Sequence, residues 1–152
     1  MSGTIVCGVT VSDEGRAAAQ LAGALSERLR LRLVLAHVVD VPPGAGESLT
    51  ARQGISGAER ALAELVEDIG GDAEARIVVG PRAERLAQLA DEEGADLIVL
   101  GSRKGGLRGG RLRCTLAQEL EAATPAPIVI APPQTRRRTE QRLALLEVSP
   151  TR

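Results

Sequence analysis

The sequence predicts an α/β fold, an open parallel sheet of five strands with helices on both faces. Short apolar runs alternate along the chain with segments in which apolar residues recur at the three- and four-residue spacing of an amphipathic helix. Strict alternation of strands and helices favours a parallel sheet. The chain has 152 residues, 43% of them hydrophobic, which suits one domain of ordinary size.

Five runs are predicted to be buried strands because each is short and apolar. They cover residues 5–9, 31–39, 75–79, 97–100 and 128–130. Ligands of open parallel sheets bind at the carboxyl ends of the strands. We therefore expect the exits of the first, second and fourth strands to converge, at Thr10, Val39–Asp40 and Gly101 respectively.

Four helices are predicted between the strands, three of them with clear ends. The first covers residues 14–29, the third runs from the Gly80-Pro81 turn to Gly94, and the fourth runs from Thr115 to about Ala123. Ser12 or Asp13 can cap the first helix. Asp13 could instead be a metal or ribose ligand, but a cap is the favoured interpretation. The fourth helix carries a capping-box signature, with Gln118 three residues after Thr115.

The second helix has a clear end but a poorly marked start. Its apolar residues lie at Leu62, Leu65, Val66 and Ile69, and Gly70-Gly71 closes it. The segment from Asp40 to Gly46 is rich in proline and glycine, so it can be neither helix nor central strand. We expect an irregular connection that reaches to about Gly57.

The composition excludes several classes of binding site. The chain has no Phe, Tyr or Trp. It therefore has no aromatic platform on which single-stranded nucleic acid could stack, and no aromatic cage for a quaternary ammonium. Positive charge is concentrated in one loop and in the C-terminal segment, so no nucleic-acid partner is expected. Any nucleotide base would have to lie against aliphatic side chains and backbone.

Metal and membrane signals are weak as well. There is one His, and Cys7 and Cys114 stand far apart, which fits no zinc-site spacing. The chain starts without a signal-peptide pattern, and no apolar run approaches the ~18 residues of a membrane span. We expect a cytoplasmic protein without a membrane partner.

A glycine-rich basic loop follows the fourth strand and is the strongest functional signal. Residues 101–114 hold five cations and no acid. A strand, a glycine-rich loop and a helix start together suit a phosphate group, because loop N–H groups and the helix N-terminus both attract anions. A solvated basic loop is the alternative interpretation. Residues 134–152 form a basic tail, either solvated and partly disordered or a helix that docks on a partner protein or a second subunit.

Several segments resemble the universal stress protein family, and the resemblance covers about residues 3–132. They are the first strand with its exit, residues 5–12; Leu35-Ala-His-Val-Val-Asp40; Leu97-Ile-Val-Leu-Gly-Ser-Arg103; and Pro127-Ile-Val-Ile130. The resemblance implies a Rossmann-like sheet in strand order 3-2-1-4-5 over residues 1–133. It also implies homodimers through the fifth strand, here Ala126 to Ala131.

The ATP-binding members of this family carry a loop motif that this chain keeps only in part. The motif reads Gly, two residues, Gly, nine residues, Gly, then Ser or Thr. Gly101 and Thr115 match its ends, but Lys104 and Cys114 replace its second and third glycines. Thr10 stands where the family has an acidic residue that meets the nucleoside, and a hydroxyl is a poorer Mg²⁺ ligand than a carboxylate. A backbone contact to adenine would fall on Val39.

These matches define a candidate site and three alternative functions. The site consists of Thr10, Val39, Gly101, Ser102, Arg103, Lys104, Gly105 and Thr115. The leading hypothesis is a non-catalytic stress-response protein that binds ATP or AMP, with a role for Mg²⁺ in doubt. The first alternative is a nucleotide-free dimeric interaction module, which the departures at Thr10, Lys104 and Cys114 favour. The second is a weak ATP hydrolase, for which the sequence shows no nucleophile–base pair.

Three further residues receive structural interpretations. His37 lies in an apolar strand and is interpreted as a satisfied core histidine rather than a catalytic base. Cys7 reads as a core residue of the first strand. Cys114 lies among cations before a helix, which would lower the pKa of its thiol, but an inert small residue is favoured over a redox role.

Overall fold

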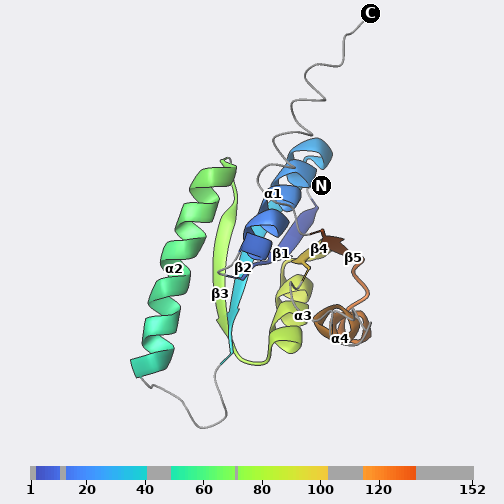
Figure 1. Cartoon of the computed structure of the whole chain (residues 1–152). Coiled ribbons are helices and arrows are strands. Elements are labelled where there is room, and N and C mark those ends of the chain that lie inside the picture. Colours follow the sequence, from blue (N-terminus) through green and yellow to red (C-terminus); the bar gives the residue numbers. More distant parts are fainter. Residues whose placement is uncertain (1–2, 11–12, 41–48, 71, 103–114, 133–152) are drawn as a thin grey trace, which may run out of the picture.

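A computed structural model of the chain describes residues 3–10, 13–40, 49–70, 72–102 and 115–132. Five parallel strands form one sheet: β1 (Thr4–Gly8), β2 (Arg32–Val39), β3 (Glu74–Val79), β4 (Ala95–Gly101) and β5 (Ile128–Ala131) (Figure 1). The strand order is β3-β2-β1-β4-β5, as the family resemblance implies. The predicted parallel α/β fold is therefore confirmed.

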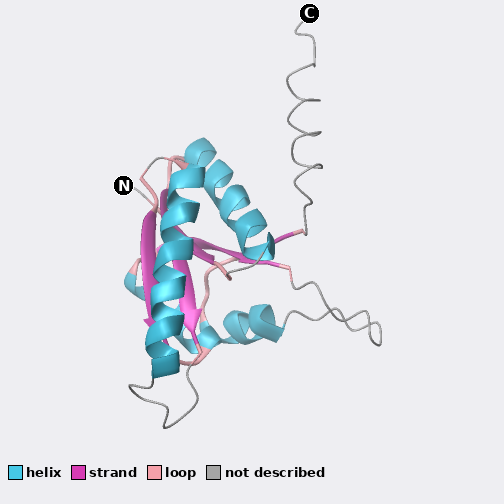
Figure 2. Cartoon of the chain, turned by 60° about the vertical axis from the view of Figure 1, so that its left-hand side comes forward, coloured by secondary structure: helices cyan, strands magenta, loops and turns pink. Residues whose placement is uncertain are grey.

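Helices cover both faces of the sheet, and strand alternation divides the core into two layers (Figure 2). On one face, Cys7 and Leu35 pack under α1 (Asp13–Leu29) and α2 (Leu49–Ile69). On the other face, Val6 and Val34 pack under α3 (Arg82–Glu92) and α4 (Thr115–Ala123). With no aromatic residue available, small helical alanines such as Ala18, Ala19 and Ala22 allow α1 to lie close to the strands. Within the described residues, no helix is long and apolar enough to cross a membrane.

The predicted start of α2 is wrong. The helix begins at Leu49, not after Gly57, and it contains both Gly54 and Gly57. Each glycine costs about 1 kcal/mol in a helix interior. Packing outweighs that cost, because α2 buries Ala58, Leu62 and Leu65 against the sheet. Strand ends differ from the prediction by at most two residues; β4, for example, begins at Ala95, which pairs with Thr4.

Two of the predicted glycine stops are confirmed by backbone conformation. Gly70 and Gly94 have φ of 70° and 60°, the left-handed conformation that ends helices. The predicted Gly80-Pro81 turn directly precedes α3.

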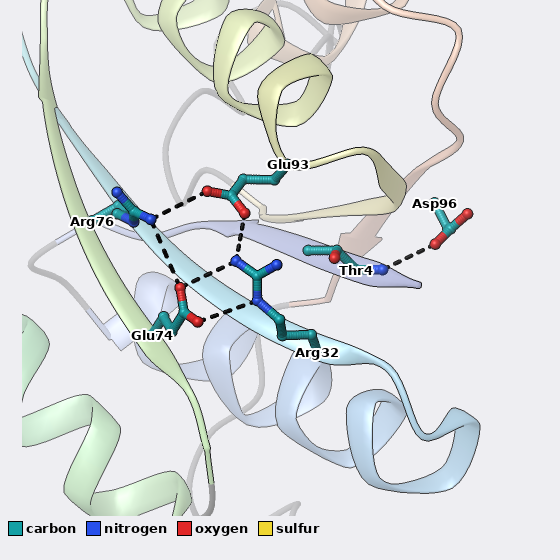
Figure 3. Close-up of polar contacts among 6 residues, drawn as sticks. All are labelled: Thr4, Arg32, Glu74, Arg76, Glu93 and Asp96. Atoms are coloured by element: carbon teal, nitrogen blue, oxygen red, sulfur yellow. Dashed lines mark hydrogen bonds and ion pairs between the residues drawn. The ribbon is translucent and has the colours of Figure 1, made fainter. Parts of the chain in front are cut away.

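A network of four charged side chains closes the amino end of the sheet (Figure 3). Arg32 at the start of β2 donates to both carboxylate oxygens of Glu74 on β3, at 3.2 Å each, and to Glu93 in the turn after α3. Arg76 lies 3.4 Å from the Glu93 carboxylate. Hydrogen bonds to Glu74 and Glu93 raise the pKa of the Arg32 guanidinium above its ordinary value. The network joins the edge strand β3 to β2 and to the start of β4.

Candidate functional site

The exits of β1 and β4 flank the point where the strand order reverses. Gly8 pairs with Ala36 of β2 on one side and with Leu100 of β4 on the other. Thr10 and Ser102 each lie two residues beyond the Gly8–Leu100 pair, so the two strands leave the sheet at the same level. In open α/β sheets this reversal opens the crevice where ligands bind. The structure therefore brings together the β1 and β4 exits, as the sequence predicts.

Thr10 lies exposed at the β1 exit, directly against the first turn of α1. A Cβ atom on buried Gly15 would fall 2.0 Å from the carbonyl oxygen of Thr10 and 2.7 Å from its nitrogen. No side chain fits there, so only glycine allows α1 to start this close to the strand exit. The N-terminal end of α1, which carries a partial positive charge, is thereby placed beside Thr10.

Ser102 offers one free polar group at the β4 exit. Its backbone N–H donates to the carbonyl oxygen of Ala131 on β5 at 3.1 Å, so the sheet already uses that donor. Its Oγ atom is buried and, within the described residues, has no hydrogen-bond partner. An unpaired buried hydroxyl costs about 1–3 kcal/mol, and such groups in native proteins commonly mark a place where a ligand or water binds.

Val39 ends β2 and forms an aliphatic part of the carboxyl edge. Its carbonyl oxygen accepts a hydrogen bond from the N–H of Gly80 at 3.0 Å. Its β3 neighbour is Val79, which is 43% exposed. Gly54 of α2 lies close by, since a Cβ there would stand 3.9 Å from a methyl group of Val39. Val39, Val79 and Gly54 thus give this side of the β1 exit, away from Ser102, aliphatic side chains and backbone.

His37 lies beside the β1 exit and has the partner that the sequence analysis expects. It is half-buried, and its Nδ1 atom lies 2.9 Å from the carbonyl oxygen of Val9. Cys7, further down β1, is fully buried as predicted. Burial raises the pKa of the Cys7 thiol to about 12, so this group stays protonated and is no nucleophile.

The remaining predicted residues divide into two groups. Thr115 begins α4 at the predicted residue, and Gly101 ends β4 opposite Ala131 of β5. Arg103, Lys104, Gly105 and Cys114 lie outside the described residues. Across the part of the chain that the structure describes, no three His, Cys, Asp or Glu side chains gather as a metal site.

Sequence reasoning missed two residues that shape the site. The sequence pattern gives Gly15 no role, and it predicts only a core position for His37. Both act on the β1 exit through contacts between elements, Gly15 on the Thr10 backbone and His37 on the Val9 carbonyl. A glycine close behind a strand exit was the only available signal for the first of them.

Comparison with known proteins agrees with this geometry. The model of the universal stress protein family matches residues 1–132. A universal stress protein encoded in the QAH/OAS sulfhydrylase 3′ region of Thermus aquaticus is 31% identical over 132 residues, which cover 84% of this chain and 96% of that protein.

Two solved structures extend the comparison. A universal stress protein in complex with cAMP is 26% identical, with a TM-score of 0.65 and coverage of 85% of this chain and 95% of that one. Universal stress protein UspA from Lactobacillus plantarum has a TM-score of 0.73 at 18% identity, with coverage of 85% and 97%. With this strand order, this strand exit and these matches, the chain belongs to the universal stress protein family.

Proposed function

We propose that this chain is a non-catalytic stress-response protein that binds an adenine nucleotide at the carboxyl ends of β1 and β4. The observation that carries the proposal is the buried Oγ of Ser102, which has no hydrogen-bond partner among the residues that the structure describes. It stands at the strand exit that faces Thr10 across the reversal of strand order. A phosphate oxygen there would accept the hydroxyl hydrogen and remove the cost of leaving this group unpaired.

The other site residues follow from this placement. Thr10 would meet the ribose with its hydroxyl, and the Val39 backbone would meet the adenine. The Val39 carbonyl already accepts a bond from Gly80, so a second bond would use its other lone pair. Gly101, Arg103, Lys104, Gly105 and Thr115 would surround the phosphate with N–H groups, a hydroxyl and two positive charges.

A related structure supports nucleotide binding, and the residue at position 10 bears on whether magnesium takes part. The 26% identical universal stress protein is in complex with cAMP. Thr10 presents a hydroxyl where a carboxylate would favour Mg²⁺, so this position would contribute little to holding magnesium. We propose ATP or AMP as ligands, with cAMP as the probe suggested by the relative.

The first test is an ultraviolet spectrum of the purified protein. Without Tyr or Trp the protein is almost transparent at 280 nm, so a bound adenine would stand out near 260 nm. A high-salt wash first removes nucleic acid. Titration calorimetry with ATP, AMP and cAMP, with and without Mg²⁺, then measures affinity. A flat spectrum with no heat of binding would reject nucleotide binding.

A pair of serine variants tests the placement of the phosphate. We expect Ser102→Ala to weaken binding by about tenfold, and to raise the free energy of unfolding by about 1 kcal/mol by removing an unpaired buried hydroxyl. Ser26→Ala is the matched control, because the Ser26 hydroxyl donates to the Leu31 carbonyl at 2.6 Å at the opposite end of the sheet. It should lower stability and leave affinity unchanged. Wild-type affinity in Ser102→Ala would remove Ser102 from the site.

We also propose a homodimer through β5, over Ala126 to Ala131. Its support is an edge strand that carries no charge and has Ile130 44% exposed.

The nucleotide-free interaction module remains the alternative to the proposed function. It predicts the same dimer together with a flat spectrum and no heat of binding. A weak hydrolase would in addition release phosphate from bound ATP.

A further inference from the structure

The one histidine of the chain holds the backbone where β1 leaves the sheet. Regular pairing of β1 with β2 ends at Gly8, opposite Ala36. The N–H of the next residue, Val9, still donates to the Ala36 carbonyl at 2.8 Å. The carbonyl of Val9 lies 2.9 Å from Nδ1 of the His37 side chain. Main chain and side chain of β2 therefore fix both polar groups of Val9, directly before Thr10.

The chemistry of this contact determines the form of the imidazole ring. A carbonyl oxygen can only accept a hydrogen bond, so Nδ1 must carry the hydrogen. In the neutral ring, Nε2 is then an acceptor. Within the described residues, no protein group is hydrogen-bonded to Nε2. The bond to Val9 thus selects one tautomer and leaves the other ring nitrogen available.

We propose that His37 is a positioning residue of the nucleotide site. Its Nδ1–H holds the Val9 carbonyl and so fixes the direction in which the chain presents Thr10 to the nucleoside. Gly15 limits the same segment from the other side, because the first turn of α1 lies against the Thr10 backbone. This inference rests on the proposed function, since it assigns a role within that site.

Two substitutions of similar size separate the hydrogen bond from packing. In His37→Asn, the amide nitrogen can stand where Nδ1 stands and donate to the Val9 carbonyl. His37→Leu places a methyl group there and leaves that carbonyl unpaired, while leucine suits a strand face that already carries Leu33 and Leu35. We expect His37→Leu to weaken cAMP or AMP binding by about tenfold and His37→Asn by less than about threefold.

A control variant tests whether loss of a side-chain-to-carbonyl hydrogen bond elsewhere in the protein also weakens nucleotide binding. Ser26→Ala removes such a bond at the opposite end of the sheet and should leave affinity unchanged. Equal affinities in wild type and His37→Leu, or equal losses in the Leu and Asn variants, would overturn the inference. If the wild-type protein binds no nucleotide, the proposed function fails, and the inferred role fails with it.

A spectroscopic test examines the bond without any ligand. Because the chain has one histidine, nitrogen-15 NMR of the ring shows a single pair of signals. At alkaline pH, where imidazole is neutral, we expect the hydrogen on Nδ1. We also expect the Thr10 amide signal to move in His37→Leu more than in His37→Asn. A hydrogen on Nε2 would overturn the inference even if both variants bind nucleotide normally, and this result is also available if His37→Leu does not fold.

Discussion

The two edge strands of the sheet are built in opposite ways. β3 presents Glu74 and Arg76 at its start, both exposed and both in the ion-pair network with Arg32 and Glu93. β5 is four residues long and has the sequence Ile-Val-Ile-Ala. An edge strand exposes unpaired N–H and C=O groups, and charged side chains are a common way to prevent another strand from pairing with it. β3 has this protection and β5 does not, so association through β5 is the natural expectation.

The large apolar side chain that is most exposed on each edge strand is exposed to almost the same extent. Val79 at the end of β3 is 43% exposed and Ile130 on β5 is 44% exposed. The two strands differ in charge, because β3 carries Glu74 and Arg76 and β5 carries no charged residue. Matched substitutions at these two residues can therefore test the comparison directly.

The largest expected effect is loss of the proposed β5 dimer in Ile130→Asp. A carboxylate on each protomer would be buried in a two-fold interface, so we expect dimerisation to weaken by about a hundredfold or more. Sedimentation equilibrium measures the change. Val79→Asp places the same charge at the same exposure on the other edge and should leave the mass unchanged. A dimer that survives Ile130→Asp, or one that dissociates only in Val79→Asp, would place the interface elsewhere.

A smaller effect is expected from Glu93→Gln, which removes one of the two carboxylates from the ion-pair network at the start of β3. Glu93 has only 13% of its side chain exposed and contacts both arginines of the network. Removal of its charge leaves Arg32 and Arg76 to share Glu74, and we expect the free energy of unfolding to fall by about 1–2 kcal/mol. Urea unfolding followed by circular dichroism measures this change.

The control for that variant is an exposed ion pair. Arg16 and Asp68 lie 3.4 Å apart with 52% and 53% of their side chains exposed. Asp68→Asn should cost no more than about 0.5 kcal/mol, because solvent screens such pairs. Similar losses in Glu93→Gln and Asp68→Asn would show that the network is no stronger than an ordinary surface pair.

The smallest effect should appear when β3 is made to resemble β5. In the double variant Glu74→Thr, Arg76→Thr, the edge keeps good strand formers but loses its charges. We expect weak additional self-association at protein concentrations above roughly 100 μM, seen by light scattering. The charge-swapped variant Glu74→Arg, Arg76→Glu keeps the edge charged and should not associate. Association in both variants would attribute the effect to disturbed packing rather than to lost charge.

The sequence predicts elements well where local signals mark their ends. Gly70 and Gly94 stop helices because their left-handed conformations are inexpensive only for glycine. α2 shows the opposite case, since the irregular connection is predicted to reach to about Gly57, whereas the helix that packs on β2 and β3 already begins at Leu49. Its start depends on contacts between elements, which no local pattern encodes.

The site was predictable to a similar extent. Thr10 and Ser102 could be placed at neighbouring strand exits from the alternation of strands and helices together with the family resemblance. The hydrogen bonds that leave some polar groups at these exits free and engage others could not be predicted. The Ser102 N–H is used by Ala131 of β5, and the Val9 carbonyl by His37, and both bonds depend on the register between strands that are distant in the sequence.

The central position of β1 has a consequence for the growing chain. Its first partner, β2, follows it closely, and Thr4 pairs there with Arg32, but on the other side Thr4 pairs with Ala95. During synthesis, β1, β2 and β3 can assemble as soon as they emerge, while the second side of β1 waits for β4. In that interval the future centre of the sheet is an unprotected edge of apolar residues, the kind of surface on which nascent chains aggregate. The most buried strand of the finished protein is thus the one most in need of protection while the protein is being made.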